Sequence, residues 1–510
     1  MKLRKDHIET INARLSLFVF AIIAISCDSF LDEIPDNRVE LNTLDKAAQL
    51  LTNGYSAASP AFTDWMTDDV QFTLGTNIRP EQLEIYNWEE VDNGGPTVQD
   101  TPDFFWFETY QAIAHANEVL AILDELPVTD SEDRLQKDAL EGEAKLIRAY
   151  GHFMLVNMFG EHYDQATAGD NLGVPFIKDP ETTFIQQYER ESVRRVYGEI
   201  EDDLLDGLEL ISDNFFLNSG KYHFNRNAAL AFASRFYLYR FDIQESLRYS
   251  NELLGSNPSA FVRDMTSQEF LQAKSSITGY PQLYSSPDLA ANLLLMRKIS
   301  LVQRTDFAFA ASNDFYSSLF GQNPLPGTTD ERENPAFVKG LDLNGDRGLF
   351  PVRYESLFER SSLNSNVGTP YHIGLMFRGE EVLFNRMECN IYSNNVSAVI
   401  DDFNVLFRRR YSGDYEDVTM ESLRTFFESL FGSSDQTSDL NVLFNILIIE
   451  KRKEFIAQGM RWFDAKRWGL DIAHNQADGS LSVLRFGDPR WVLQIPNSAI
   501  DVGGLEPNPR

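Results

Sequence analysis

Helical periodicity dominates the pattern of apolar and polar positions along the chain. In residues 192–211, apolar side chains recur every three or four positions, and acidic side chains mostly occupy the opposite side. Ser192 stands where an N-cap is expected. The apolar positions are Val193, Val196, Tyr197, Ile200, Leu204, Leu208 and Ile211. The spacing therefore predicts an amphipathic helix with one buried face.

Other helices are predicted on both sides of this one, and they arrive in pairs with short connections. They cover residues 104–126, 131–159, 226–241 and 244–254. Paired helices with short connections are typical of stacked helical hairpins, as in tetratricopeptide-type solenoids, although no clean 34-residue repeat accompanies them. The pattern predicts a mostly α fold with tetratricopeptide-like hairpins.

Long segments between the predicted helices lack periodicity of either kind. Residues 56–103 contain Pro, Gly, Asn, Asp and Thr throughout, together with several aromatic residues. Structureless segments of more than about 15 residues are usually functional or disordered, and the aromatic content argues against disorder. Similar loops are predicted at residues 256–290, 321–375 and 475–499. The sequence therefore predicts a loop-rich portion beside the hairpins that is functional rather than disordered.

The N-terminus has the layout of an export signal. Basic residues at Lys2, Arg4, Lys5 and Arg14 precede an apolar run over residues 15–25, which is shorter than the roughly 20 residues that span a bilayer. The run leads directly to Cys27, as in bacterial lipoprotein signals. We expect residues 1–26 to be removed and Cys27 to be lipidated; the alternative is an ordinary signal peptide with an incidental cysteine.

Charge limits the partners that the protein can bind. Lys and Arg number 45 and Asp and Glu 77, which gives a net charge of −32. A phosphate backbone would be repelled, so nucleic acid is not an expected partner. Polyanionic glycans are disfavoured for the same reason, unless a local basic patch overrides the long-range field.

Sequence motifs for catalysis are absent. The chain has no G-x-S-x-G elbow, P-loop, H-E-x-x-H or paired C-x-x-C motif, which leaves enzyme activity unproven rather than disproved. A pair of carboxylates such as a glycosidase uses is left open by sequence alone. The segment "DLNGDRG" places Asp342, Asn344 and Asp346 at alternate positions, as in calcium loops. Because Arg353 stands where such a loop has its acidic twelfth residue, a polar turn is the preferred interpretation, and no cofactor is expected.

Residues 446–469 form a block of mixed charge and large aromatic side chains, predicted to begin as a helix. Three acidic and three arginine residues in it can pair, while tryptophan and phenylalanine bury area around them. The acidic residues are Glu450, Glu454 and Asp464, and the arginines are Arg452, Arg461 and Arg467. The block is either a binding face or a packed structural joint, and we favour the joint.

Motifs along the whole chain resemble those of the SusD/RagB-like family of outer-membrane nutrient-binding lipoproteins of Bacteroidetes-type bacteria. The resemblance begins with the lipidated cysteine and its short following motif, which match Cys27, Phe30, Leu31, Asp32 and Pro35. It continues through "FFWFETYQAIAHAN" (residues 104–117), "EAKLIRAYGHFMLVNMFG" (143–160) and "LGVPF" (172–176). The late motif matches Ile446, Glu450, Glu454, Gly459, Arg461, Trp462, Asp464, Arg467, Trp468 and Gly469, and "LQIPNSAID" (493–501) and "NP" (508–509) match the closing segment.

The resemblance implies a single SusD-like domain over residues 27–510, with helical hairpins in the half at about 27–255 and a loop-rich half at about 256–510 with closing helices. It implies that the loop-rich portion faces the ligand and that the protein is not an enzyme. It implies a cell-surface lipoprotein, anchored in the outer membrane through its lipid, that captures oligosaccharide as a lid on a SusC-like TonB-dependent transporter. A peptide-binding RagB-like lid and a scaffold of the transporter complex without a small ligand are the alternatives.

Within that interpretation, sugar binding is expected from aromatic platforms, because a flat ring stacks on the apolar face of a sugar while amides and carboxylates hold its hydroxyls. The first choice is Trp65, Tyr86 and Trp88 with Asp68 and Asp69, and the second is Tyr280 and Tyr284. The competing interpretation is that these aromatics anchor their own loops in the core. Trp106, Trp462, Trp468 and Trp491 are assigned to structure.

Overall fold

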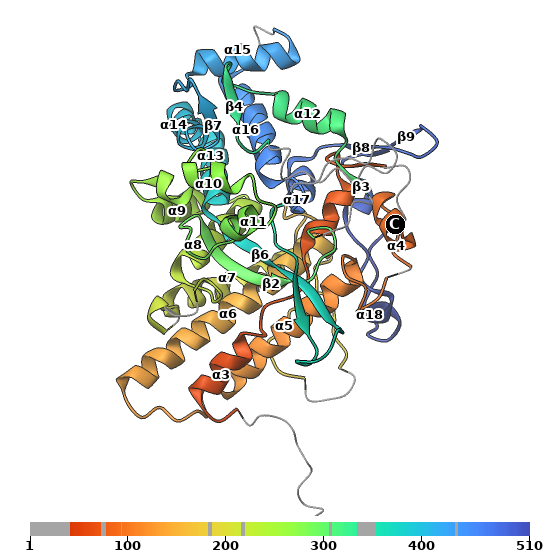
Figure 1. Ribbon diagram of the computed structural model, residues 1–510. Helices are drawn as coiled ribbons and strands as arrows, with labels where there is room; N and C mark the ends of the chain where they lie inside the picture. The colour runs from red at the N-terminus through yellow and green to blue at the C-terminus, as the bar shows by residue number, and fades with distance from the viewer. Residues whose placement is uncertain are drawn as a thin grey trace, which may run out of the picture. The chain divides into compact units, whose positions relative to one another are not determined.

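A computed structural model describes residues 41–72, 78–92, 94–181, 186–215, 220–304, 309–333, 352–433 and 437–510. The chain divides into two units, Met1–Thr43 and Leu44–Arg510, and the second carries the elements of the fold (Figure 1). The predicted leader, Cys27 and the loop with Asp342, Asn344 and Asp346 lie outside the described residues. Lipidation and calcium binding therefore stay predictions.

Consecutive helices pack as antiparallel hairpins, as predicted. Helices α5 and α6 pack together, as do α6 and α7, and α8 and α9 (Figure 1). These helices are α5 (Pro102–Ile122), α6 (Ser131–Phe159), α7 (Val193–Leu210), α8 (Arg226–Tyr239) and α9 (Ile243–Leu254). Two further helices, α13 (Gly379–Tyr392) and α14 (Val396–Phe407), pair with each other, and α13 also packs on α9. The mostly α fold is confirmed.

Local capping explains where these helices begin. Ser192 is the N-cap of α7, and its hydroxyl accepts from the backbone N–H of Arg195. Helix α5 begins two residues before the predicted boundary because Thr101 caps it and Pro102 occupies its first turn, where a missing N–H costs nothing. Helix α6 covers the predicted residues without change, with Asp130 as its N-cap.

The long loops contain more regular structure than the sequence predicts, and in that respect the prediction is wrong. Most of the elements in them have two to seven residues, too few to show periodicity, and several begin with a cap or a proline in the first turn. These are η1 (Pro60–Met66), β1 (Gln71–Phe72), α4 (Pro80–Tyr86), η3 (Pro258–Phe261), α10 (Gln268–Ala273), α11 (Gly279–Tyr284), β9 (Leu481–Leu484) and η5 (Pro489–Trp491). The remaining helices are α3 (Leu44–Leu51), η2 (Asp213–Phe215), α12 (Asn313–Gly321), α15 (Met420–Phe431) and α18 (Asn497–Asp501).

A three-stranded antiparallel sheet in the order β2-β6-β5 lies among the helices (Figure 1). Its strands are β2 (Asn292–Lys298), β6 (Gly368–Arg378) and β5 (Leu357–Arg360). Three two-stranded pairs accompany it: β1 with β3 (Phe309–Ala310), β4 (Thr328–Asp330) with β7 (Tyr411–Gly413), and β8 (Ile472–Asn475) with β9. The sequence did not predict these strands, because buried strands such as β2 read as short apolar runs without alternation.

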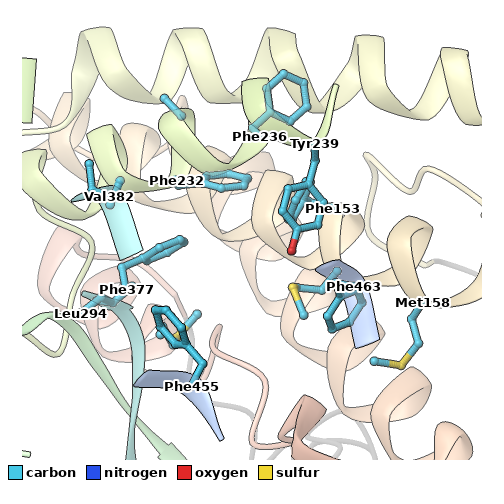
Figure 2. Close-up of a cluster of buried hydrophobic side chains, with 14 of the residues drawn as sticks. Phe153, Met158, Phe232, Phe236, Tyr239, Leu294, Phe377, Val382, Phe455 and Phe463 are labelled. Carbon is cyan, nitrogen blue, oxygen red and sulfur yellow. The ribbon is translucent and has the colours of Figure 1, made fainter. Parts of the chain in front are cut away.

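The main hydrophobic core brings the N-terminal hairpins against the C-terminal helices. Figure 2 shows Phe153 of α6, Phe232 and Phe236 of α8, and Phe377 of β6 gathered in one cluster. Phe455 and Phe463 enter the same cluster from α16 (Asp439–Phe455) and α17 (Met460–Trp468). Phe153, Phe455 and Phe463 also line a cavity of about 70 Å³. The two halves of the sequence therefore share one core.

The block at residues 446–469 is a structural joint, although it is not one continuous helix. Helix α16 ends at Phe455, and Ala457 and Gly459 adopt φ angles of +62° and +77° before α17 begins. A Cβ on Gly459 would lie 2.3 Å from the carbonyl oxygen of Pro60. The helix therefore breaks where η1 passes close to its backbone, and only glycine allows that approach. Trp106, Trp462 and Trp491 are buried, and the indole N–H of Trp468 donates to Glu388, in agreement with their structural assignment.

Buried ion pairs connect this joint to the rest of the core. Arg410, which is fully buried, donates from Nε and Nη2 to the two carboxylate oxygens of Glu454, each at 2.9 Å, and Nη2 also contacts Glu380 at 3.2 Å. Arg332 donates to Asp330 and Glu450. Burial opposes ionisation of Glu454, but the arginines around it hold its pKa below the usual range.

The predicted pairing within the block is correct only for Asp464 with Arg467, which lie 2.9 Å apart. Glu450 and Glu454 pair instead with arginines far along the chain, and Arg452 and Arg461 pair with Asp68. Pairing across the fold cannot be read from spacing along one helix.

Asp64 connects η1 to the joint. Its Oδ2 accepts from the backbone N–H of Gly459 at 2.9 Å, and its Oδ1 has no hydrogen-bond partner among the described residues. Burial, with Asp69 nearby, raises the pKa of Asp64 from 3.8 to about 8. The folded protein therefore keeps a proton here that the unfolded chain releases above pH 4.

The Arg410 ion pair gives the first testable prediction. Arg410→Met leaves the carboxylate of Glu454 buried without its bidentate partner, and we expect unfolding free energy to fall by about 3–5 kcal/mol. Arg408→Met is the matched control, because Arg408 pairs with Asp417 at an exposed site and should cost less than about 1 kcal/mol. Equal losses in urea melts of the two variants would contradict the role given to Arg410.

The buried carboxyl of Asp64 gives the second testable prediction. Because the pKa of Asp64 is higher in the folded state than in the unfolded state, its contribution to stability falls as pH rises from about 4 to 8. Asp64→Asn lacks this titration, so its unfolding free energy relative to wild type should rise by about 1–3 kcal/mol between pH 5 and pH 8. Asp170→Asn, at an exposed position, is the control substitution. A flat difference for Asp64→Asn would refute the raised pKa.

Candidate functional site

The first-choice aromatic residues gather in one stack beside the joint. Tyr86 lies between Phe309 and His474, with ring centroids 4.2 Å from each. Trp88 stacks on the same histidine at 4.3 Å, and Trp65 meets Phe309 edge-on at 6.3 Å. The predicted residues therefore come together, with His474 and Phe309 added to them.

The rings in this stack face one another rather than solvent. Exposed fractions are 1% for Trp65, 0% for Tyr86 and 5% for Trp88. The indole N–H of Trp88 donates to the carbonyl of Met66 at 2.9 Å, and the hydroxyl of Tyr86 donates to that of Asn475 at 2.8 Å. Burial of this kind supports loop anchoring for these residues. Direct ligand contact by them stays a prediction.

The carboxylates of the first choice lie beside α16 and α17. Asp68 pairs with Arg461 at 2.9 Å and with Arg452 at 3.2 Å, and Asp69 pairs with Arg452. Burial alone would raise the pKa of Asp68, but Arg452 and Arg461 lower it to about 2. Asp69 is buried, whereas the side chain of Asp68 is partly exposed. Asp68 is therefore the member of the predicted set whose charge reaches the surface.

Tyr280 and Tyr284 belong to a separate buried cluster with Met265, Phe270 and Tyr354. The hydroxyl of Tyr284 accepts from Nη1 of Arg378 at 2.6 Å, and the guanidinium of Arg263 lies 4.3 Å from its ring centroid. The structure thus does not bring the second-choice tyrosines into the stack that contains Trp88.

Backbone strain marks the loop that follows the stack. Trp88 and Asp100 have φ angles of +57° and +63°, a region that bulky residues rarely adopt and that often accompanies function. Asp100 Oδ2 accepts from the backbone N–H groups of Leu301 and Val302. The loop of residues 87–101 is therefore fixed at both ends, with exposed acidic residues between them.

Sequence reasoning missed the neighbours that hold this loop. Arg304 donates from Nε to the carbonyl of Ser300 and from Nη2 to Gln99, 2.8 and 3.2 Å away. The ring nitrogens Nδ1 and Nε2 of His474 each lie 2.8 Å from a backbone carbonyl oxygen, that of Tyr86 and that of Thr67, and a protonated ring nitrogen donates to the carbonyl that it faces. Burial lowers the pKa of His474. No motif surrounds either residue in the sequence, so only the folded arrangement reveals them.

Metal chemistry finds no support among the residues that the structure describes. No group of three or more His, Cys, Asp or Glu side chains there is arranged to hold a metal ion. In the same part of the chain, no helix has both the length and the apolar character needed to span a bilayer.

Two family models match the chain on both sides of its middle. The model described as "Starch-binding associating with outer membrane" matches residues 29–238, and the SusD family model matches residues 359–499. SusD-like protein P38 of Formosa agariphila is 20% identical over 523 aligned residues, which cover 95% of each chain.

Solved structures show the same fold. A SusD superfamily protein of Bacteroides thetaiotaomicron matches with a TM-score of 0.66 and 18% identity, covering 92% of this chain and 100% of that one. A laminarin-binding SusD-like protein matches with a TM-score of 0.59 and 16% identity, covering 92% and 99%. Proteins of this family bind glycans at the outer membrane. With helical hairpins, motif order and family models in agreement, the chain belongs to the SusD/RagB-like family.

Proposed function

We propose that this protein is a lipid-anchored receptor on the cell surface that captures neutral oligosaccharide and passes it to a TonB-dependent transporter of the outer membrane. The observation that carries the proposal is the match of the model described as starch-binding to residues 29–238, together with the SusD family model at residues 359–499. The laminarin-binding relative supports a saccharide as the ligand class.

Charge supports a neutral rather than an anionic glycan. The net charge of −32 repels sulfated or uronic-acid chains at long range. Four cations around the stack are already paired with carboxylates: Arg452 with Asp69, Arg461 with Asp68, Arg490 with Asp488 and Arg510 with Glu90. A neutral sugar instead meets carboxylates and amides that accept and donate to hydroxyls.

We place the ligand at the exposed edge of the loop of residues 87–101. The buried stack packs against the inner side of this loop. Gln99 and the acidic residues Glu89, Glu90 and Asp92 lie toward the surface. Preorganised loops lose little freedom on binding, which favours affinity. The first-choice aromatics then act by positioning the loop and Asp68, with direct ring stacking on sugar as the alternative that mutation tests.

A peptide-binding protein, or a scaffold that binds no small ligand, would have the same fold. No described observation favours either over a glycan. The buried and partly buried carboxylates beside the stack, Asp64, Asp68, Asp69 and Asp100, are held by arginines or by backbone N–H groups, which favours a binding role over a catalytic one.

Glycan retention tests the proposal. Native electrophoresis through gels that contain starch, laminarin or an anionic uronan should show retardation by a neutral glucan and none by the uronan, with no release of sugar from the polymer. Trp88→Phe keeps the stack but loses the bond to Met66, worth about 1 kcal/mol, and should weaken retention about fivefold. Trp106→Phe, another buried tryptophan, should leave it unchanged. Retention on immobilised peptides alone would favour the peptide alternative.

Lipidation at Cys27 is tested separately in cells. Wild type should partition into the detergent phase of Triton X-114 and be cleaved by protease added to intact cells. Cys27→Ala removes the site of acylation, and the protein should move to the aqueous phase because acyl chains supply the membrane affinity. A wild-type protein that stays aqueous would rule out the anchor.

A further inference from the structure

One face of the β2-β6-β5 sheet carries exposed aromatic and charged side chains that the stack beside α17 does not use. Along β6, His372 and Gly374 are buried while Tyr371 and Ile373 are half-buried. Residues directly opposite in antiparallel strands point to the same face. Arg297 of β2 lies opposite Ile373, and in β5 Leu357 lies opposite Tyr371 and Glu359 opposite Thr369. Tyr371, Arg297 and Glu359 therefore share the outer face (β2 and β6 in Figure 1).

Contacts among these three side chains confirm that arrangement. The guanidinium of Arg297 lies 5.0 Å from the ring centroid of Tyr371, and its Nη2 donates to Glu359 at 2.9 Å. The side chains of Arg297 and Glu359 are 38% and 64% exposed. An exposed pair of this kind contributes little to stability, so the fold does not depend on it. Its hydrogen-bonding groups are accessible to a ligand.

A second tyrosine lies at the other edge of the sheet. The backbone N–H of Leu295 donates to the carbonyl of Lys221 at 2.8 Å, so residues 220–222 run beside β2. Tyr222 is 36% exposed. Residues 220–222 therefore border the sheet on the β2 side, which gives the spatial order 220–222, β2, β6 and β5. We define Tyr222, Arg297, Glu359 and Tyr371 as the sheet platform.

We propose that the sheet platform is a second glycan-binding surface, for neutral oligosaccharide, built on the sheet rather than on the loop of residues 87–101. The apolar face of a pyranose stacks on a phenol ring, while guanidinium and carboxylate groups bind its hydroxyls. Arg297 and Glu359 neutralise each other, which suits an uncharged ligand. An apolar protein surface would have to desolvate this ion pair, at a cost that its apolar contacts must first offset. The inference rests on the proposed function and adds a site to it.

Two sites on one protein bind a long polymer more tightly than either does alone, because the second contact is intramolecular. The double variant Tyr222→Ala/Tyr371→Ala should therefore show about tenfold weaker retention in gels that contain the neutral glucan retained by wild type. In calorimetry with a short oligosaccharide of that glucan, the stoichiometry should fall from two to one. Tyr392→Ala, a comparably exposed tyrosine on α13, is the matched control and should change neither result.

A second double variant, at the exposed ion pair, distinguishes a loss of binding from a loss of folding. Arg297→Ala/Glu359→Ala alters exposed groups, so it should melt at the wild-type temperature and still lose polymer retention. Wild-type stoichiometry of one together with unchanged retention in both double variants would overturn the sheet platform while leaving the proposed function intact. Failure of wild type to be retained by starch or laminarin would count against both.

Discussion

The buried ion pair between Arg410 and Glu454 is the constraint on which the rest of the arrangement depends. Arg410 precedes β7, and Glu454 lies in the last turn of α16. Removing two charges from water costs several kcal/mol, which only close pairing with additional hydrogen bonds can offset. Arg410 meets that condition with a bidentate contact to Glu454 and further bonds to Glu380 and the carbonyl of Arg263. The end of α16 is thereby fixed against three distant segments.

The position of α16 in turn determines the candidate site. Helix α16 ends one residue after Glu454, and residues 456–459 are not helical. There Gly459 approaches the backbone of η1 so closely that a Cβ would collide with Pro60. Asp64 accepts from Gly459, and Arg452 and Arg461 hold the aspartates that follow η1. The stack with Trp88 lies on this base and holds the strained loop of residues 87–101. The buried ion pair, the end of α16 and the loop of residues 87–101 are therefore connected by an unbroken series of contacts.

Helices with a regular apolar face were predictable from sequence, and the predicted residues 131–159 coincide with α6 because its caps and its buried face are all local. The interruption of the helix after Phe455 was not predictable from sequence. It depends on the close approach of Pro60, which lies nearly 400 positions earlier in the chain. The same holds for Glu450 and Glu454, whose partners Arg332 and Arg410 are invisible to helical spacing. Trp65, Tyr86 and Trp88 were grouped because they lie in one aperiodic segment, and the fold does bring their rings together. Whether the rings face solvent depends on the fold, and sequence could not decide it.

Hydrogen–deuterium exchange with and without a retained neutral glucan tests the central claim most directly, because it reports where the ligand acts on the folded chain. The account predicts that bound glucan protects backbone amides in residues 87–101 and 299–304 and along β5 and β6, and leaves the α8–α9 hairpin unchanged. Protection confined to the helical hairpins, with none in the loop or the sheet, would contradict it.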